Sequence, residues 1–140
     1  MGSPRRSTDR RGAVKYDEFI EKVLERAGVP PDQATVLTAA TLQTLAERIT
    51  GGEARDLAAQ LPKAMQELLR KTGEEAEAFS LDEFMRRVAE RAAVRVTEAR
   101  DGARAVFTTL REAVSGGEFK DVLAQLPKEY RELVQTAGRR

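Results

Sequence analysis

The chain has 140 residues and a formal net charge of +1, and it contains neither cysteine nor histidine. Without cysteine it has no disulfides, thiolate nucleophiles or thiolate zinc sites, and without histidine it has no imidazole metal ligands and no Ser-His or Cys-His catalytic pair. Hydrophobic residues make up 41% of the chain but aromatic residues only 5%, which predicts helices packed around a core of Leu, Val and Ala.

The small net charge predicts no long-range attraction to nucleic acid or to a membrane surface. No apolar run approaches the ~20 residues that a bilayer-spanning helix needs, and no apolar segment follows the basic N-terminus as a signal peptide requires. We therefore expect a soluble, cytoplasmic protein without membrane partners.

One stretch of sequence occurs twice. Residues 51–63 read GGEARDLAAQLPK and residues 116–128 read GGEFKDVLAQLPK, at an offset of 65 residues. The offset holds without a gap between residues 16–73 and 81–138, where roughly 25 of about 58 aligned positions are identical, so the chain is an internal duplication. Because each half alone has little interior volume, we expect both halves to share one core.

The N-terminal tail, residues 1–14, has no apolar periodicity and is predicted to be disordered. Its basic side chains leave a second interpretation open, in which the tail is an arm that contacts an anionic partner. These side chains are Arg5, Arg6, Arg10 and Arg11.

The first repeat, residues 15–73, predicts four helices. An apolar stripe marks the first over residues 16–27, and Pro31 suits the first position of a long second helix over residues 31–50. Gly51-Gly52 is predicted to let the chain turn through a left-handed residue into a short third helix. Pro62 then begins a fourth helix that ends near Gly73.

An acidic linker, residues 74–79, leads into the second repeat, residues 80–138, and Phe79 is predicted to staple the helix that follows. Ser80 and Glu83 have the spacing of a capping box. The long helix of this repeat is predicted over residues 96–115, and Gly102 within it suggests close approach of another helix. The fold class is therefore all-α, with about eight helices in two pseudo-symmetric four-helix repeats that form one domain.

The pattern of Tyr16-Asp17-Glu18-Phe19 at a helix start, an Ala/Leu-rich long helix, and then Gly-Gly-Glu followed by Ala-Gln-Leu-Pro-Lys resembles the bacterial family catalogued as domain of unknown function 2267. The resemblance extends over residues 16–138. It implies an all-helical fold and a bacterial origin, and it brings no catalytic residue with it.

Two carboxylate pairs, Glu53 with Asp56 and Glu118 with Asp121, recur at the same offset. If the duplication brings the pairs together, they have the oxygen ligands that Ca²⁺, Mg²⁺ or Mn²⁺ takes. A carboxylate in the first turn of a helix is also stabilised by ~0.3 to 1 kcal/mol through the helix dipole alone. The dipole interpretation is preferred, so we predict no metal and no other cofactor.

A basic stripe is formed on the second long helix by Arg100, Arg104 and Arg111, which lie on one side. Acidic residues interleave with them, and no aromatic side chains are spaced for base stacking, which favours an ordinary solvated face. With the basic tail, this stripe supports an alternative hypothesis of a nucleic-acid-associated protein.

The corner sequences keep Gln60 and Lys63 in one copy and Gln125 and Lys128 in the other, although the turn itself requires only Leu-Pro. Either these side chains bond to backbone across the corner, or the two corners form a paired surface for a partner. We predict a non-enzymatic binding or scaffolding module that uses the corners, together with the two carboxylate pairs, for another protein or for self-association. A carboxylate- or metal-dependent enzyme is less favoured, because it needs Glu53, Asp56, Glu118 and Asp121 to converge in a cleft.

Overall fold

The computed structural model describes residues 11–135, and within that range the fold is all-α, as predicted, with no strand. The first half contains α2 (Arg11–Ala27), α3 (Pro31–Arg48), α4 (Gly51–Ala59), α5 (Lys63–Gln66) and the 3₁₀ turn η1 (Glu67–Leu69). The second half contains α6 (Leu81–Ala92), α7 (Val96–Ala113), α8 (Gly116–Ala124), the 3₁₀ turn η2 (Lys128–Arg131) and α9 (Glu132–Gln135).

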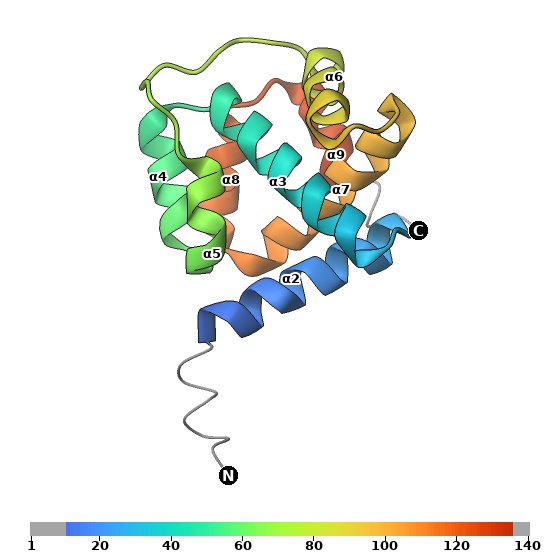
Figure 1. The fold of residues 1–140 in the computed structure, drawn as a ribbon. Coiled ribbons are helices and arrows are strands. Elements are labelled where there is room, and N and C mark those ends of the chain that lie inside the picture. Colours follow the sequence, from blue (N-terminus) through green and yellow to red (C-terminus); the bar gives the residue numbers. More distant parts are fainter. Residues whose placement is uncertain (1–10, 136–140) are drawn as a thin grey trace.

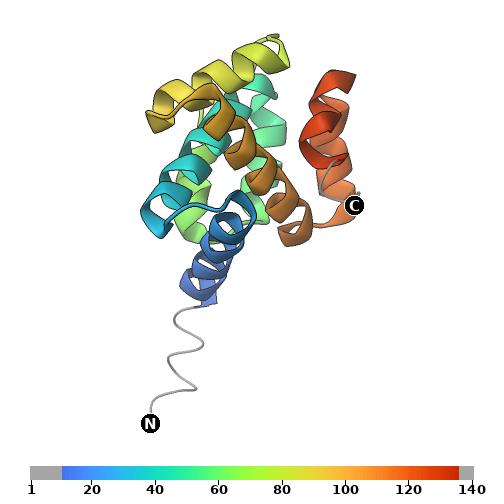
Figure 2. The same cartoon turned by 90° about the vertical axis from the view of Figure 1, so that its right-hand side faces the viewer.

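The two halves are interlocked. Helix α2 packs on α7 as well as on its own neighbour α3, and α6 packs on α3 as well as on α7 (Figures 1 and 2). One hydrophobic cluster runs through both halves, from Phe19 in α2 to Val134 in α9. The predicted shared core is therefore confirmed, and each half depends on the other to cover its apolar faces.

Helices α3 and α7 contact each other at Leu37 and Gly102, two positions related by the 65-residue offset. A Cβ atom at Gly102 would lie 2.7 Å from Leu37 Cδ2. The glycine thus makes room for the leucine, and the predicted close approach of a second helix is confirmed.

The boundaries of the first and long helices differ from those expected. Helix α2 begins at Arg11, so residues 11–14 belong to a helix rather than to the predicted disordered tail, while residues 1–10 lie outside the described range. The long helices end at Arg48 and Ala113, earlier than expected, because Thr50 and Ser115 cap the next helices. Each cap residue is extended, and its hydroxyl accepts a hydrogen bond from the amide three residues on.

Gly51 does not turn the chain as predicted, because it already belongs to helix α4 and does not have a positive φ. Its backbone N–H donates to the Glu74 carbonyl at 2.8 Å, which joins the linker to the start of α4. A Cβ atom at this position would meet the end of the exposed Glu74 side chain, which can move aside.

The last helical segment of each half combines α-helix and 3₁₀ turn, and in the first half it is shorter than predicted. In the first half α5 gives way to η1 and helical structure ends at Leu69, before Gly73. In the second half the order is reversed, with η2 preceding α9, and the predicted end at Gly138 lies outside the described residues.

Candidate functional site

The corner glutamines bond across the interface between the two halves. The Ser115 N–H donates to Gln60 Oε1 at 2.7 Å, and the Thr50 N–H donates to Gln125 Oε1 at 2.9 Å. Since Ser115 and Thr50 cap α8 and α4, each glutamine holds the helix start of the opposite half. These reciprocal bonds give a structural reason for a glutamine in both copies. Lys63 and Lys128, by contrast, are exposed.

Replacing a corner glutamine should therefore weaken the junction between halves. We expect Gln60→Ala and Gln125→Ala each to lower the free energy of unfolding by about 1 kcal/mol, the usual net contribution of one hydrogen bond. Urea unfolding measures the change. Gln43→Ala, at an exposed position of α3, is the matched control and should change the stability by less than ~0.5 kcal/mol.

The start of α8 lies beside α4, and carboxylates of the two helices meet there. One oxygen each from Glu53, Asp56 and Glu118 lie within 4.8 Å of one another. Glu118 is only 9% exposed, and Oε2 of Glu53 and Oε2 of Glu118 are buried without a hydrogen-bond partner in the described part of the chain. Asp121, the remaining member of the two repeated carboxylate pairs, is exposed. We call Glu53, Asp56 and Glu118 the acidic cluster.

Burial and then the neighbouring Glu53 carboxyl, with smaller effects from Asp56 and Asp121, together raise the pKa of Glu118 to about 8. Glu53 and Glu118 also occupy the first turns of their helices, as the dipole interpretation required. The helix ends thus favour the carboxylates individually, while their mutual approach disfavours ionising both.

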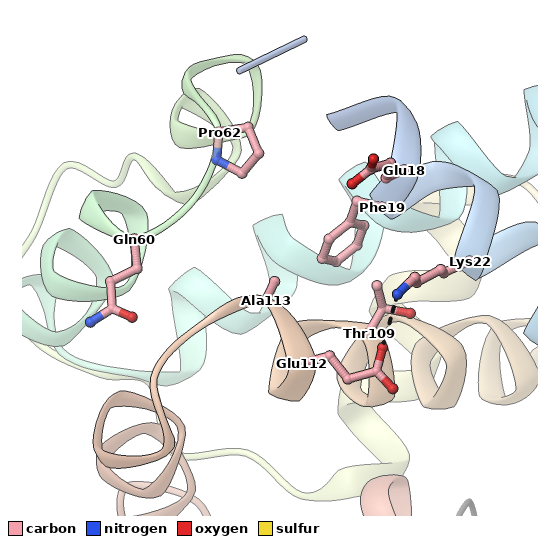
Figure 3. A pocket seen from close by; sticks show the side chains of 8 residues that line it. All are labelled: Glu18, Phe19, Lys22, Gln60, Pro62, Thr109, Glu112 and Ala113. Carbon is pink, nitrogen blue, oxygen red and sulfur yellow. Dashed lines mark ion pairs between the residues drawn. The ribbon is translucent and has the colours of Figure 1, made fainter. Parts of the chain in front are cut away.

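A second feature is an open cleft of about 320 Å³ where α2 meets α7 and the first corner (Figure 3). We call it the α2–α7 cleft. It is lined by Glu18, Phe19, Lys22, Gln60, Pro62, Thr109, Glu112 and Ala113.

Polar contacts tie the wall of this cleft together. Lys22 Nζ lies 3.6 Å from Glu112 Oε1, and the Arg26 guanidinium contacts both Glu112 Oε2 at 2.7 Å and Thr109 Oγ1 at 2.9 Å. The hydrogen bond from Arg26 lowers the pKa of Glu112, so this carboxylate is ionised at neutral pH. The lining of the cleft therefore combines the Phe19 ring with a cation and an anion.

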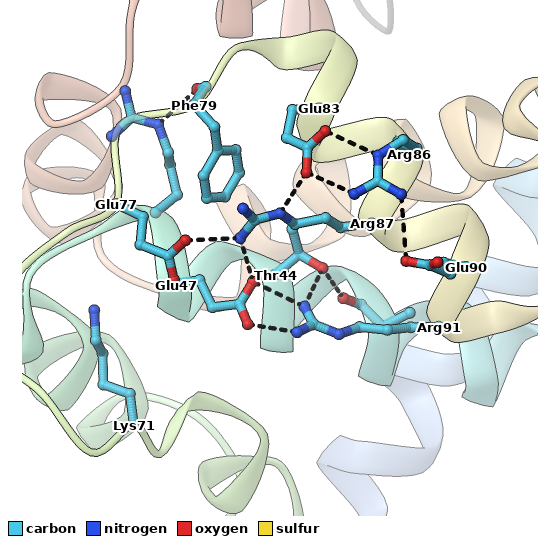
Figure 4. Close-up of polar contacts among 12 residues, drawn as sticks. Thr44, Glu47, Lys71, Glu77, Phe79, Glu83, Arg86, Arg87, Glu90 and Arg91 are labelled. Atoms are coloured by element: carbon cyan, nitrogen blue, oxygen red, sulfur yellow. Dashed lines mark hydrogen bonds and ion pairs between the residues drawn. The ribbon is translucent and has the colours of Figure 1, made fainter.

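Matching contacts recur between α3 and α6 at the 65-residue offset (Figure 4). Arg91, the counterpart of Arg26, bonds to Thr44 and Glu47, the counterparts of Thr109 and Glu112. Arg87 also pairs with Glu47 at 2.9 Å, and with Glu83 and Glu77. Hydrogen bonds from Arg86 and Arg87 lower the pKa of Glu83 to about 2.

Phe79 of the linker lies among these side chains. We call Thr44, Glu47, Phe79, Arg87 and Arg91 the second region. The Arg87 guanidinium lies 3.9 Å from its ring centroid, and the rings of Phe79 and Phe84 are 6.4 Å apart. Because Phe79 precedes the Ser80 cap and packs on the fourth residue of α6, the predicted staple is confirmed. Only the Ser80 half of the predicted capping box is formed as expected, since the Glu83 carboxylate bonds to Arg86 and Arg87.

Removing the Phe79 ring should loosen the linker. We expect Phe79→Ala to lower the free energy of unfolding by about 2 kcal/mol, less than the 3–5 kcal/mol of a fully buried ring, because Phe79 is only partly buried. Thermal and urea unfolding would test this. Ala78→Gly, at the exposed neighbouring position, controls for a change in linker flexibility.

The predicted basic stripe is partly neutralised. Arg100 pairs with Glu132 at 2.9 Å, Arg104 lies 3.8 Å from the same carboxylate, and Arg111 is exposed. Arg11 is the first residue of α2, whereas Arg5, Arg6 and Arg10 lie outside the described residues. The structure therefore gives no continuous row of free cations along the described part of α7.

Sequence reasoning did not single out the α2–α7 cleft. Glu18, Lys22 and Glu112 occupy polar positions of amphipathic helices, which have the pattern of an ordinary solvated face. A signal was nevertheless present in the alignment of the repeats, where Ala113 stands opposite Arg48. The small side chain of Ala113 lines the open cleft, whereas the large side chain of Arg48 stands at the equivalent position beside the linker.

Fold and site together define an interlocked helical domain with an acidic cluster where α4 meets α8 and a cleft between α2 and α7. The chain matches, over residues 16–133, the family model described as an uncharacterized conserved protein, DUF2267, and it belongs to that family. No curated protein matches the chain. None of the helices in residues 11–135 combines the length and apolar character needed to cross a bilayer.

Proposed function

We propose that this protein is a non-enzymatic binding module whose α2–α7 cleft takes an extended segment of a partner protein bearing an aromatic side chain. One observation carries the proposal: the place equivalent to the cleft, 65 residues further along, is filled by such a segment from the chain's own linker. The first corner contributes Gln60 and Pro62 to the cleft, so the partner surface includes one of the repeated corners.

The equivalence rests on matched side chains. Phe84 and Arg87, which contact Phe79, are the counterparts of Phe19 and Lys22 in the cleft. Arg48 completes the second region by donating from Nε to the Phe79 carbonyl at 3.0 Å. Its counterpart in the cleft is Ala113, a methyl group in place of a guanidinium.

The differences between the α2–α7 cleft and the second region explain why the cleft is open. Arg48 and Tyr130 both fill space around the linker, and their counterparts are the smaller Ala113 and Met65. Phe79 itself corresponds to Val14, which belongs to helix α2 and not to an extended linker. The α2–α7 cleft therefore has the same wall as the second region but lacks the linker segment that covers it there.

The chemistry of the linker indicates the chemistry of the partner segment. Phe79 stacks on Arg87, and Glu77, two residues earlier, pairs with the same guanidinium at 3.1 Å. In the cleft Lys22 takes the place of Arg87. We therefore expect the partner to place an acidic residue two positions before an aromatic one, so that both interact with the Lys22 ammonium group.

A peptide with the linker's own sequence tests the proposal. The probe is the heptapeptide Glu-Glu-Ala-Glu-Ala-Phe-Ser, copied from residues 74–80, titrated into the full chain and followed by ¹H–¹⁵N NMR. We expect amide shifts concentrated at Phe19, Lys22 and Thr109, with a dissociation constant on the order of 1 mM for so short a peptide. The same peptide with Ala in place of Phe should cause no shifts.

A variant of the chain makes the test site-specific. Ala113→Arg puts into the cleft the side chain that Arg48 places in the second region, and it should abolish the shifts. Ala124→Arg, at an exposed position of α8, adds the same charge elsewhere and should leave them unchanged. Shifts that persist in Ala113→Arg, or that do not depend on the peptide's aromatic ring, would contradict the proposal.

Nucleic acid is the less favoured partner, because Arg26, Arg100 and Arg104 are already engaged by carboxylates. A labelled DNA duplex at low salt should show no anisotropy change at micromolar protein. A saturable, salt-sensitive change that requires Arg111 and the basic tail would favour the nucleic-acid hypothesis instead.

A further inference from the structure

The acidic cluster contains buried oxygen atoms that the described part of the protein does not satisfy. Oε2 of Glu53 and Oε2 of Glu118 are both buried and lack a hydrogen-bond partner there. Glu118 is more than nine-tenths buried and directs its carboxylate toward the other two members. Buried polar atoms are normally satisfied, so these oxygens favour a positive charge between them, which is supplied either by a shared proton or by a bound cation.

No ion pair joins a basic side chain within residues 16–134 to the acidic cluster. Arg55, which precedes Asp56 in α4, pairs with Glu74 at 2.8 Å and so reaches toward the linker. Gln60 and Gln125, the polar side chains of the corners, are committed to Ser115 and Thr50.

We propose that Glu53, Asp56 and Glu118 form a binding site for a single divalent cation with the ligand preferences of Ca²⁺. The site draws on both halves of the duplication, since Glu53 and Glu118 are counterparts at the 65-residue offset. It is distinct from the α2–α7 cleft and does not depend on the function proposed for that cleft.

The oxygen positions are compatible with a cation of the size of calcium, and its tolerance of irregular geometry favours it over magnesium. Three oxygens within 4.8 Å of one another share a point no further than about 2.8 Å from each. Calcium binds oxygen at about 2.3–2.6 Å in flexible geometry, so small side-chain adjustments complete the contacts, whereas magnesium requires about 2.0–2.1 Å in a strict octahedron. Asp121, exposed one turn after Glu118, is placed to contribute through water, and water fills the remaining positions.

Localised paramagnetic broadening tests the site directly. After removal of metals with EDTA, the full chain is titrated with Mn²⁺ and followed by ¹H–¹⁵N NMR. We expect the amides of residues 52–56 and 116–121 to broaden first, and excess Ca²⁺ to restore them. Calorimetry with Ca²⁺ should give a dissociation constant on the order of 10⁻⁴ M, typical of partly hydrated sites.

Matched variants separate a built site from general attraction to acidic surface. Glu118→Gln and Glu53→Gln keep the side-chain shape and should each weaken Ca²⁺ binding at least about tenfold, since each removes a charged ligand. Asp82→Asn, which neutralises an exposed first-turn carboxylate on α6, should leave binding within about twofold of the parent chain.

Three results would overturn the proposal: no heat and no broadening, broadening spread evenly over acidic residues, or binding unchanged in both Gln variants. Preserved NMR dispersion in the two Gln variants shows that a loss of binding is not a loss of folding. If only one variant is folded, its affinity alone decides the question.

Discussion

Gly102→Leu is expected to destabilise the protein by about 3 kcal/mol. Leu37 is fully buried, and even a Cβ atom at Gly102 would lie 2.7 Å from its Cδ2 and 2.8 Å from its Cδ1. A leucine there must push apart α3 and α7, which cross at the centre of the shared core. Overpacking of this kind typically costs 1–3 kcal/mol, and a crossing of two long helices gives little room to relax.

Urea unfolding with and without a compensating substitution tests the contact. Leu37→Ala alone should cost about 3 kcal/mol through the cavity that it leaves. Combined with Gly102→Leu, it should cost at least ~1 kcal/mol less than the sum of the two, because the new leucine fills the space vacated. Gly117→Leu is the control, since a Cβ atom there meets nothing within 4 Å. Additive losses in the double variant would show that Leu37 and Gly102 do not share one space.

The 65-residue offset between the repeats was the basis for most of the fold prediction. It predicted a shared core, and Leu37 and Gly102 show why: equivalent positions of the two halves meet, so one must shrink where the other is large. Ser80 and Phe79 could also be placed from local sequence, because capping and stapling depend on neighbours within one turn. The capping signal failed where other partners in the same helix competed, as for Glu83, whose carboxylate bonds to Arg86 and Arg87 one turn later in α6.

The two candidate sites depended on contacts that a single sequence does not specify. The carboxylates of Glu53 and Glu118 have the same first-turn pattern whether the helix starts are adjacent or far apart, and only the packing of α4 beside α8 brings them together. Likewise, the sequence shows Arg48 opposite Ala113 but not that Arg48 bonds to the linker at Phe79 while Ala113 lines an open cleft. Gly51 shows the reverse case, in which a residue suited to a turn instead lies in α4 and bonds through its backbone to Glu74.

Glu118→Gln is expected to stabilise the metal-free protein increasingly as pH rises. The pKa of Glu118 is about 8 in the folded protein against 4.5 for the unconstrained group, owing to burial and then to Glu53, Asp56 and Asp121. The folded state therefore binds this proton more tightly than the unfolded state does. Any stability from the protonated group is fully present below pH 4.5 and is lost as pH rises toward about 8.

The glutamine variant removes this dependence, because its amide is neutral at every pH and can donate a hydrogen bond to the Glu53 carboxylate. One pKa unit corresponds to about 1.4 kcal/mol, but Asp56 and Asp121 are exposed and water screens their charge. We therefore expect the variant to match the parent near pH 4.5 and to exceed it by about 2 kcal/mol at pH 8.

Urea unfolding in EDTA at half-unit pH intervals measures the difference between parent and variant, so that titrations common to both cancel. Asp82→Asn should show no gain that grows with pH, since its carboxylate lies outside the acidic cluster. A variant equally or less stable than the parent at pH 8 would show that Glu118 ionises without opposition. Adding Ca²⁺ to the parent chain should reduce the difference, because a cation bound among Glu53, Asp56 and Glu118 offsets the repulsion that the glutamine removes.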